Sequence, residues 1–414
     1  MQKPKVVILA GGSNSRFFPL NTQVHKGAIN FFGQPLITRT LNNLAQNGFK
    51  EVIIIQSRRD EESGSLRQVV GQNEHNLNIT FATQNESKGM GDALLTVKDQ
   101  LENKFAVIFP DLLNGGDLIN EMLNLDSDGS ICASQTNEPW LYGILELDGD
   151  KAVGIEEKPE KGTEKSNIKI LGCYLLNQKF ISILNSLPES EYNFEEALSQ
   201  TMKETNMRAL ILNEAIRSLK FPWHLFNLQK ILFTKHKSYT SSAAKISQSA
   251  ILDDSKGPII IEDGARVGDF AKIVGPCYIG KDCLVGDYSF VRQSSLEERS
   301  VVGANTEVVR SIIMDKSTLH FGYLADSIIG PNNQIGAGLI TANKRLDRAN
   351  VITMVKGVKT DTGINALGIV TGEGAKIGIR TSTMPGVLIG AGAQIYPGQV
   401  VSKNIEHNAT LKNS

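Results

Sequence analysis

The residues best suited to chemistry form a small-residue loop followed by two cations. The apolar run Val6-Val7-Ile8 leads into Leu9-Ala10-Gly11-Gly12, and Arg16 and Lys26 follow shortly after. A strand that ends in a tight loop of small residues, ahead of a helix, presents backbone N–H groups to phosphates. Arg16 and Lys26 add positive charge beside the loop. The pattern predicts a phosphate-binding site in a nucleotide-binding domain.

Strands and helices alternate through the first half of the chain and must position this loop. Apolar runs predict strands at 6–9, 52–55, 79–82, 106–109 and 131–133, with helices near 36–47, 60–71, 90–103 and 116–125. Strands this apolar, separated by helices, are typical of a parallel sheet covered on both faces. Ligands bind at the carboxyl ends of such strands, so we expect the first loop and Asp111 to face one another.

The second half follows a six-residue period. Aliphatic or threonine residues recur every sixth position from 261 to 291 and again from 371 to 401, often with glycine next to them. This is the hexapeptide repeat of a parallel β-helix, in which each rung is one side of a triangular coil. A polar, lysine-rich excursion interrupts the repeat at about 344–368. The predicted organisation is an α/β domain over 1–235, a linker over 236–250 and a β-helix over 251–414.

The first loop resembles the signature of the sugar-1-phosphate nucleotidylyltransferases. Asn14 stands where that family has a glycine, and asparagine tolerates a positive φ better than most residues. The matching positions are Leu9, Ala10, Gly11, Gly12, Arg16, Pro19, Leu20 and Lys26. The resemblance implies a Rossmann-like nucleotidyltransferase domain. It also implies Mg²⁺ as a cofactor and transfer of a nucleotidyl group to a sugar 1-phosphate.

Further family-like motifs follow in the family's order. Gln84 with Lys88–Ala93 resembles the base-binding segment, and Phe109-Pro110-Asp111 resembles the strand end that binds Mg²⁺. Tyr142-Gly143 and Glu156–Pro159 resemble the sugar-binding motifs. By this resemblance, Arg16 and Lys26 are catalytic and Asp111 is the metal ligand. The implied nucleotide-binding residues are Leu9, Ala10, Gly11, Gly12, Gln84 and Gly89, and the implied sugar-phosphate-binding residues are Gly143, Glu157, Lys158 and Asn167.

Two segments of the β-helix resemble the amino-sugar-1-phosphate acetyltransferase domains. They are Leu319–Ser327, which contains His320 and Tyr323, and Ile335–Asn343. Removing a proton from an attacking amine suits a histidine, which titrates near neutral pH. The resemblance makes His320 the catalytic base, with Tyr323 and Asn343 as partners of the substrate or of the oxyanion.

The whole chain therefore resembles the bifunctional sugar-1-phosphate nucleotidylyltransferase/acetyltransferases, with a left-handed β-helix. The implied product is UDP-N-acetylglucosamine or UDP- or dTDP-glucose. The implied second reaction is N-acetylation of glucosamine 1-phosphate from acetyl-CoA, in a homotrimer. Ser218 stands where the family has a second metal-binding acid, and Ala366 stands where it has a phosphate-binding lysine. Two alternatives stay open: a pyrophosphorylase whose β-helix only oligomerises, and a non-catalytic nucleotide-sugar-binding regulatory protein.

The net charge and the cysteine content bear on which binding partners and which cellular compartment we expect for this protein. The formal net charge of −1 gives no electrostatic basis for binding nucleic acid or a membrane surface. The four cysteines are scattered through the chain and form no metal-type cluster. A reducing cytoplasmic setting is the expectation that follows.

Overall fold

The computed structural model describes residues 3–12, 14–21, 25–71, 76–213 and 219–412. Its contacts divide the chain into two compact units. The sheet unit comprises 1–13 and 35–218, and the β-helix unit comprises 14–34 and 219–414. Over the described ranges, the helices are too short or too polar for a bilayer crossing.

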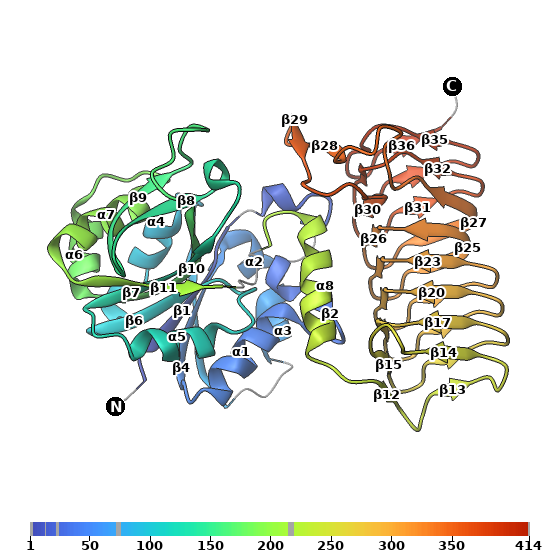
Figure 1. Cartoon of the computed structure of the whole chain (residues 1–414), viewed down its shortest axis with the longest axis horizontal. Helices are drawn as coiled ribbons and strands as arrows, with labels where there is room; N and C mark the ends of the chain where they lie inside the picture. The colour runs from blue at the N-terminus through green and yellow to red at the C-terminus, as the bar shows by residue number, and fades with distance from the viewer. Residues whose placement is uncertain (1–2, 13, 22–24, 72–75, 214–218, 413–414) are drawn as a thin grey trace. The chain divides into compact units, whose positions relative to one another are not determined.

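The sheet unit is built on a mixed β-sheet with a doubly covered core (Figure 1). Both faces of its central strands are buried: Val6, Val7, Ile53 and Ile54 are at most 2% exposed. The strand order is β5 (Asn78–Gln84), β4 (Glu51–Ser57), β1 (Lys5–Ala10), β6 (Lys104–Ile108), β10 (Ile168–Asn177), β7 (Gly129–Gln135), β11 (Met207–Leu212), β9 (Lys151–Glu157), β8 (Gly143–Asp148).

The five predicted strands run in one direction, as expected, but β9 and β10 run the opposite way in the same sheet. The strands β1, β4, β5 and β6 pair in parallel, as predicted. The strand β10, however, lies antiparallel between β6 and β7. Only residues 158–167 separate β9 from β10. The chain reverses at the hairpin between β8 and β9, and β10 keeps the direction of β9, because both strands are antiparallel to β8.

The predicted helices are present, with two changes of extent. The segment predicted at 60–71 is split because Gly64 adopts a left-handed φ of +65°. The helix predicted at 90–103 ends at Leu95, ahead of the β-branched pair Thr96-Val97. The helices of this unit are α1 (Leu36–Gln46), α2 (Arg58–Ser63), α3 (Ser65–Gly71), α4 (Met90–Leu95), α5 (Gly115–Leu123), α6 (Gln178–Ser186) and α7 (Asn193–Glu204).

The β-helix unit stacks short parallel strands in three columns (Figure 1). The first column is β12 (Tyr239–Thr240), β15 (Ile259–Ile261), β18 (Cys277–Ile279), β21 (Ser295–Leu296), β24 (Ile312–Ile313), β26 (Ile328–Ile329), β30 (Ile369–Thr371) and β33 (Val387–Ile389). The second is β13 (Lys245–Ile246), β16 (Arg266–Val267), β19 (Leu284–Val285), β22 (Val301–Val302), β25 (Thr318–Ala325), β27 (Gln334–Thr341), β31 (Lys376–Ile377), β34 (Gln394–Ile395) and β36 (Thr410–Leu411). The third is β14 (Ile251–Asp253), β17 (Lys272–Val274), β20 (Phe290–Arg292), β23 (Glu307–Val309), the second halves of β25 and β27, β32 (Ser382–Thr383) and β35 (Val400–Val401). The fold class, an α/β nucleotidyltransferase domain followed by a left-handed parallel β-helix, is as predicted.

The strand stack starts earlier than the predicted repeat. The strands β12 and β13, within the expected linker 236–250, already pair with β15 and β16 of the next coil. The residues of these two strands are mostly polar or exposed, so they do not contribute to the aliphatic six-residue pattern from which the repeat was predicted. The domain boundaries at residues 235 and 251 remain a prediction.

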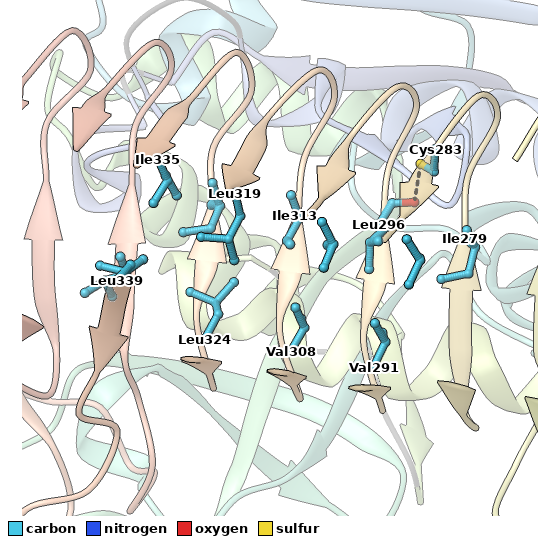
Figure 2. Packing of buried hydrophobic residues seen from close by; sticks show 14 of the residues in the cluster. Ile279, Cys283, Val291, Leu296, Val308, Ile313, Leu319, Leu324, Ile335 and Leu339 are labelled. Carbon is cyan, nitrogen blue, oxygen red and sulfur yellow. Dashed lines mark hydrogen bonds between the residues drawn. The ribbon is translucent and has the colours of Figure 1, made fainter. Parts of the chain in front are cut away.

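The apolar stack also continues where the six-residue period is lost (Figure 2). Ile261 pairs with Ile279, a coil of 18 residues, whereas Ile279 pairs with Leu296 and Leu296 with Ile313, coils of 17. The next coil, from Ile313 to Ile329, has 16. Shorter turns therefore break the period in the sequence while each inward side chain still stacks on the one below.

A hairpin, a helix and a short strand also belong to the β-helix unit. The hairpin of β28 (Ile352–Val355) and β29 (Val358–Asp361) projects from the stack at the predicted interruption (Figure 1). The strand β26 pairs directly with β30, so the column continues past this arm. The helix α8 (Leu225–Thr234) belongs to the same unit, as does β2 (Asn30–Phe31), which pairs with β3 (Gln34–Pro35) in a short ribbon.

Candidate functional site

The glycine loop at the end of β1 is fitted closely to the end of β5. Leu9 and Ala10 are the last residues of β1 and are buried. A Cβ added at Gly11 would lie 2.6 Å from the amide oxygen of Gln84, the last residue of β5. A side chain at this position would therefore displace the Gln84 carboxamide from its place in the loop. At Gly12 an added Cβ would meet no atom within 4 Å. The structure thus brings Gly11 and Gln84, both predicted from the sequence to bind the nucleotide, close together.

Gln84 ties this loop to the start of α4. Its amide nitrogen donates to the carbonyl of Gly89 at 3.0 Å and to Asp92 Oδ2 at 2.8 Å. Gly89 lies at φ +109°, where a side chain would be strained, and an added Cβ would approach the carbonyl of Glu191 to 2.7 Å. Gln84, Gly89 and Gly11 therefore form one cradle of backbone and amide groups. Asp92, which sequence reasoning missed, orients the carboxamide.

Asp111 lies in the turn that follows β6. It is 3% exposed, and its neighbour Pro110 accepts a hydrogen bond from Thr40 Oγ1 at 2.9 Å. Among the described residues no group of three His, Cys, Asp or Glu side chains could hold a metal ion. Mg²⁺ often binds through one or two carboxylates together with substrate phosphates, and a single buried Asp at a strand end fits that mode. Ser218, the other position of interest, lies outside the described residues.

The predicted sugar-binding residues meet at the β8–β9 hairpin. Gly143, at the start of β8, pairs with Glu157 at the end of β9. An added Cβ at Gly143 would lie 2.6 Å from Glu157 Oε2. Lys158 has a left-handed φ of +48°, and its Nζ lies 3.4 Å from Glu157 Oε1. Asn167 is exposed just before β10, where its carbonyl accepts from the N–H of Thr136 at 2.9 Å.

Glu195, in the first turn of α7, was missed from the sequence. Its pKa is raised to about 7, chiefly by burial; the negative charge of Glu157 contributes to the rise, whereas a backbone hydrogen bond and Lys158 oppose it. Asn193, in the same helix turn as Glu195, packs closely against Gly91: a Cβ added at Gly91 would lie 2.1 Å from Asn193 Oδ1. A helical acid pair such as Glu195-Glu196 is ordinarily solvated, so no pattern in the chain marked this carboxyl as buried.

Arg16 and Lys26 belong to the β-helix unit, whereas Gly11, Gln84, Asp111 and Lys158 belong to the sheet unit. Arg16 is exposed in the 3-10 turn Ser15–Phe17. Asn14 precedes this turn at φ +50°, the left-handed conformation that we expected asparagine to supply. The Nζ of Lys26 donates to the carbonyl of Leu219 at 3.2 Å.

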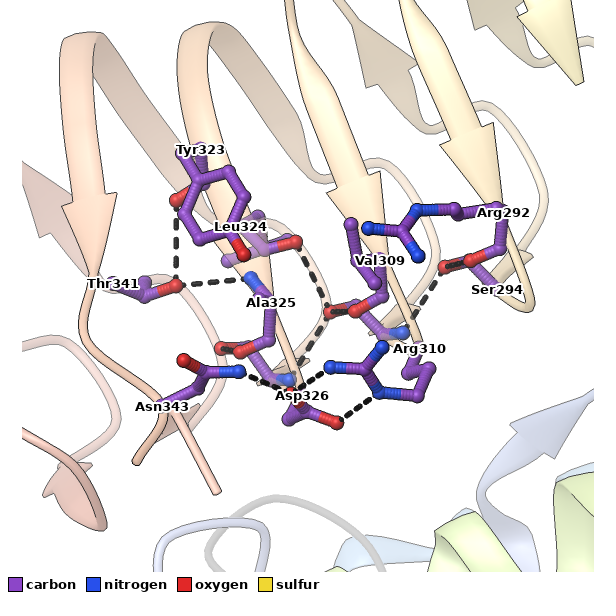
Figure 3. Close-up of polar contacts among 12 residues, drawn as sticks. Arg292, Ser294, Val309, Arg310, Tyr323, Leu324, Ala325, Asp326, Thr341 and Asn343 are labelled. Atoms are coloured by element: carbon purple, nitrogen blue, oxygen red, sulfur yellow. Dashed lines mark hydrogen bonds and ion pairs between the residues drawn. The ribbon is translucent and has the colours of Figure 1, made fainter. Parts of the chain in front are cut away.

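The residues proposed for acetyl transfer lie on neighbouring coils of the β-helix, and Figure 3 shows two of them, Tyr323 and Asn343. His320 and Tyr323 are on β25, where His320 is exposed and Tyr323 is half-buried, and Asn343 follows β27. The carbonyl of Tyr323 accepts from Thr341 Oγ1 at 3.3 Å, which joins β25 to β27.

Asp326 connects three of these coils. Its carboxylate accepts from Arg310 Nε and from an Arg310 terminal nitrogen, both at 2.6 Å, and from Asn343 Nδ2 at 2.5 Å (Figure 3). It is 6% exposed, so these contacts compensate a buried charge, and they raise the pKa of Arg310. A hydrogen on the Asn343 amide nitrogen is thereby committed to Asp326, which fixes the direction in which its oxygen points.

A second ion pair lies beside this group. Arg292 and Glu307, on adjacent strands β20 and β23, are 3.2 Å apart. Glu307 is also the register neighbour of Tyr323. The sequence motifs did not mark Arg292, Glu307 or Arg310, because these residues lie on coils that precede the two matched segments. Asp326 was part of the matched segment but had no assigned role.

Comparisons with known proteins agree with both halves. The nucleotidyl transferase family model matches residues 5–217, and the bacterial transferase hexapeptide model (six repeats) matches residues 258–293. The second match ends where the coils shorten from 18 to 17 residues.

Several curated relatives span nearly the whole chain. The bifunctional protein GlmU of Methanococcus aeolicus is 29% identical over 97% of this chain and 96% of its own length. The bifunctional sugar-1-phosphate nucleotidylyltransferase/acetyltransferase of Sulfurisphaera tokodaii is 29% identical over 99% of this chain and 100% of its own length. The glucose-1-phosphate thymidylyltransferase of Mycolicibacterium smegmatis is 31% identical over 46% of this chain and 68% of its own length. The nucleotidyl transferase family model matches more than half of the residues of this chain, so the chain belongs to the nucleotidyl transferase family.

Proposed function

We propose that this chain is a bifunctional enzyme that transfers a nucleotidyl group to a sugar 1-phosphate and acetylates an amino-sugar 1-phosphate. The observation that carries the proposal is the continuous similarity to bifunctional relatives over 97% or more of the chain. The cradle of Gly11, Gln84 and Gly89 supports the first activity. The cluster of Arg310, Asp326 and Asn343, next to the strand β25 that carries His320 and Tyr323, supports the second.

In the first reaction, a sugar-phosphate oxygen attacks the α-phosphorus of a nucleoside triphosphate and pyrophosphate leaves. The chain's contribution is positioning and charge neutralisation. Arg16 and Lys26 hold the triphosphate and the leaving pyrophosphate, and Lys158 pairs with the sugar phosphate. Glu157 accepts hydrogen bonds from sugar hydroxyls. Asp111 would hold Mg²⁺, which neutralises phosphate charge when bound.

In the second reaction, the amine of a glucosamine 1-phosphate attacks the thioester carbonyl of acetyl-CoA. A C–N bond forms, the C–S bond breaks, and the coenzyme A thiolate leaves. His320 accepts the proton that the amine loses. Tyr323 and Asn343 contact the sugar or the developing oxyanion. We place both reactions in the cytoplasm, where four buried, unpaired cysteines stay reduced.

A homotrimer assembled through the β-helix is part of the proposal. Phe270 and Tyr288 lie at matching turns of successive coils, where they stack with ring centroids 5.2 Å apart. They remain 58% and 61% exposed. Adjacent exposed aromatic rings of this kind fit a surface that a second copy covers. Light scattering of the wild type and of Tyr288→Ser measures the assembly.

The test of the first activity is release of pyrophosphate with Mg²⁺ from UTP or dTTP. The acceptors are glucose 1-phosphate, N-acetylglucosamine 1-phosphate and glucosamine 1-phosphate. We expect release with one nucleotide–sugar pair and a loss of at least ~100-fold in Asp111→Asn. A folded chain that binds nucleotide sugar but releases no pyrophosphate would instead be a non-catalytic binding protein.

The second activity is tested separately by release of free coenzyme A from acetyl-CoA and glucosamine 1-phosphate. We expect His320→Asn to remove it, by ~100-fold or more, while leaving pyrophosphate release unchanged. A wild-type chain that is inert in this assay but active in the first would have a β-helix that serves assembly alone.

A further inference from the structure

The segment 25–34, which carries Lys26, is fastened to the first column of the β-helix. The N–H groups of Phe32 and Gly33 donate to the two carboxylate oxygens of Glu297, at 2.9 and 3.1 Å. Glu297 follows β21 directly and is fully buried. Its own N–H donates to the carbonyl of Ile313 on the next coil at 2.8 Å, so its backbone is fixed in the stack.

Aromatic packing holds the same segment in place. The ring of Phe32 stacks on Tyr278 of β18, with centroids 4.7 Å apart and planes 17° apart. Phe233 of α8 meets the ring of Phe32 edge-on at 4.8 Å. Gly33 lies at φ +70°, and an added Cβ would come 2.7 Å from the Tyr278 hydroxyl oxygen. A side chain there would be strained and would have to displace the Tyr278 hydroxyl, so the backbone packs directly against the β-helix.

A third contact lies one coil further along the column. Asn30 Nδ2 donates to Asp315 Oδ2 at 2.8 Å. Burial raises the pKa of Asp315, and the hydrogen bond from Asn30 opposes that rise. Buried carboxylates need such donors, because an uncompensated charge in the interior is strongly unfavourable. Glu297 and Asp315 are therefore matched to this segment, and hexapeptide packing alone does not require either of them.

The anchored residues lie only a few positions from Lys26. The 3-10 turn Lys26–Ala28 begins after His25, whose Nδ1 accepts from the N–H of Gly27 at 3.0 Å. The strand β2 follows almost at once and leads into Phe32. A change at Glu297 would therefore be transmitted through a short, hydrogen-bonded stretch of chain to the ammonium group of Lys26.

We propose that Glu297 is a positioning residue for nucleotidyl transfer, acting through the segment Lys26–Gly33. The inference rests on the proposed function, in which Lys26 holds the triphosphate. In-line transfer depends on placement of the neutralising charge, and displacement by about 1 Å can lower the rate ~100-fold. The β-helix would then contribute to nucleotidyl transfer directly, in addition to any role in assembly or acetylation.

The test is Glu297→Gln in the full-length chain, measured by pyrophosphate release. The variant keeps the shape but turns one hydrogen-bond acceptor into a donor that faces a backbone N–H. We expect kcat for pyrophosphate release to fall at least ~10-fold, with acetyl transfer within twofold of wild type. The conservative Glu297→Asp should recover part of the loss. Glu298→Gln, at the next position in the chain and more exposed, is the matched control and should have no effect.

The outcomes separate this inference from the proposed function. An active wild type whose kcat is unchanged by Glu297→Gln overturns the positioning role alone. Equal losses of both activities with a lowered melting temperature also overturn it, because they indicate a merely structural role. If Glu297→Gln fails to fold, Asn30→Ala, which removes the neighbouring contact, must show the same selective loss. A wild type that releases no pyrophosphate with any substrate pair overturns the proposed function itself.

Discussion

Replacing Glu195 by glutamine should make the sheet unit more stable above neutral pH. The pKa of Glu195 is raised from 4.5 to about 7, first by burial and then by the charge of Glu157, against a favourable hydrogen bond from its own backbone. Glu191 also raises it and Lys158 lowers it. The folded chain therefore binds this proton more tightly than the unfolded chain. The stabilising effect of that proton is complete below pH ~4.5 and is lost as the pH rises through 7.

The size of the effect follows from the shift. A rise of about 2.5 pKa units corresponds to about 3 kcal/mol of unfolding free energy between pH 4 and pH 8. Glu195→Gln removes the titration, so we expect it to match the wild type near pH 5. By pH 8 it should exceed the wild type by about 2–3 kcal/mol.

The assay is urea denaturation at pH 5 and pH 8, followed by tryptophan fluorescence. Glu196→Gln, on the exposed side of the same helix turn, is the control and should give the same small difference at both pH values. A difference between Glu195→Gln and the wild type that does not change with pH would refute the assignment of a buried, protonated carboxyl at this position.

Two further substitutions test the closely packed parts of the sites. Gly11→Ala brings a methyl group to within 2.6 Å of the Gln84 amide oxygen, so we expect pyrophosphate release to fall at least ~10-fold while the melting temperature, followed by circular dichroism, changes little. Asp326→Asn removes the charge that Arg310 and Asn343 share; we expect about 2 kcal/mol of lost stability by urea denaturation and a ~10-fold fall in acetyl transfer. Unchanged acetyl transfer in Asp326→Asn would show that the contacts among Arg310, Asp326 and Asn343 only stabilise the β-helix and play no part in acetyl transfer.

The parts of the β-helix with a regular six-residue repeat could be predicted from the sequence. The parts in which shorter turns interrupt that repeat could not. The inward positions Ile261, Ile279 and Ile389 are fully buried, as the six-residue period predicted. Between these regions the coil shortens by one or two residues, so the period disappears although Leu296 and Ile313 still stack. Turn length is set by local backbone geometry, which hydrophobic periodicity does not record.

Local motifs located the site residues, but long-range contacts decided their surroundings. Gly11 and Gln84 are 73 positions apart and meet because parallel strands end at one edge, which strand order alone predicts. The antiparallel direction of β10 could not be foreseen from apolar runs, because it follows from the reversal at the β8–β9 hairpin and an apolar run does not record strand direction. Glu195 could not be foreseen either, because an acid at a helix N-terminus is usually solvated and its burial here depends on distant packing.

The placement of residues 14–34 bears on what the β-helix is for. A β-helix that only assembled copies would need apolar faces and an apolar interior, and neither requires a buried carboxylate. Glu297 is such a carboxylate, and its two oxygens accept the N–H groups of Phe32 and Gly33. Removing that segment would take two hydrogen bonds away from a buried carboxylate, which is unfavourable, so the β-helix and the segment that carries Lys26 are chemically dependent on one another. Loss of the β-helix should therefore impair nucleotidyl transfer even in a chain whose sheet unit stays folded. An architecture in which the β-helix served assembly alone would not predict that loss.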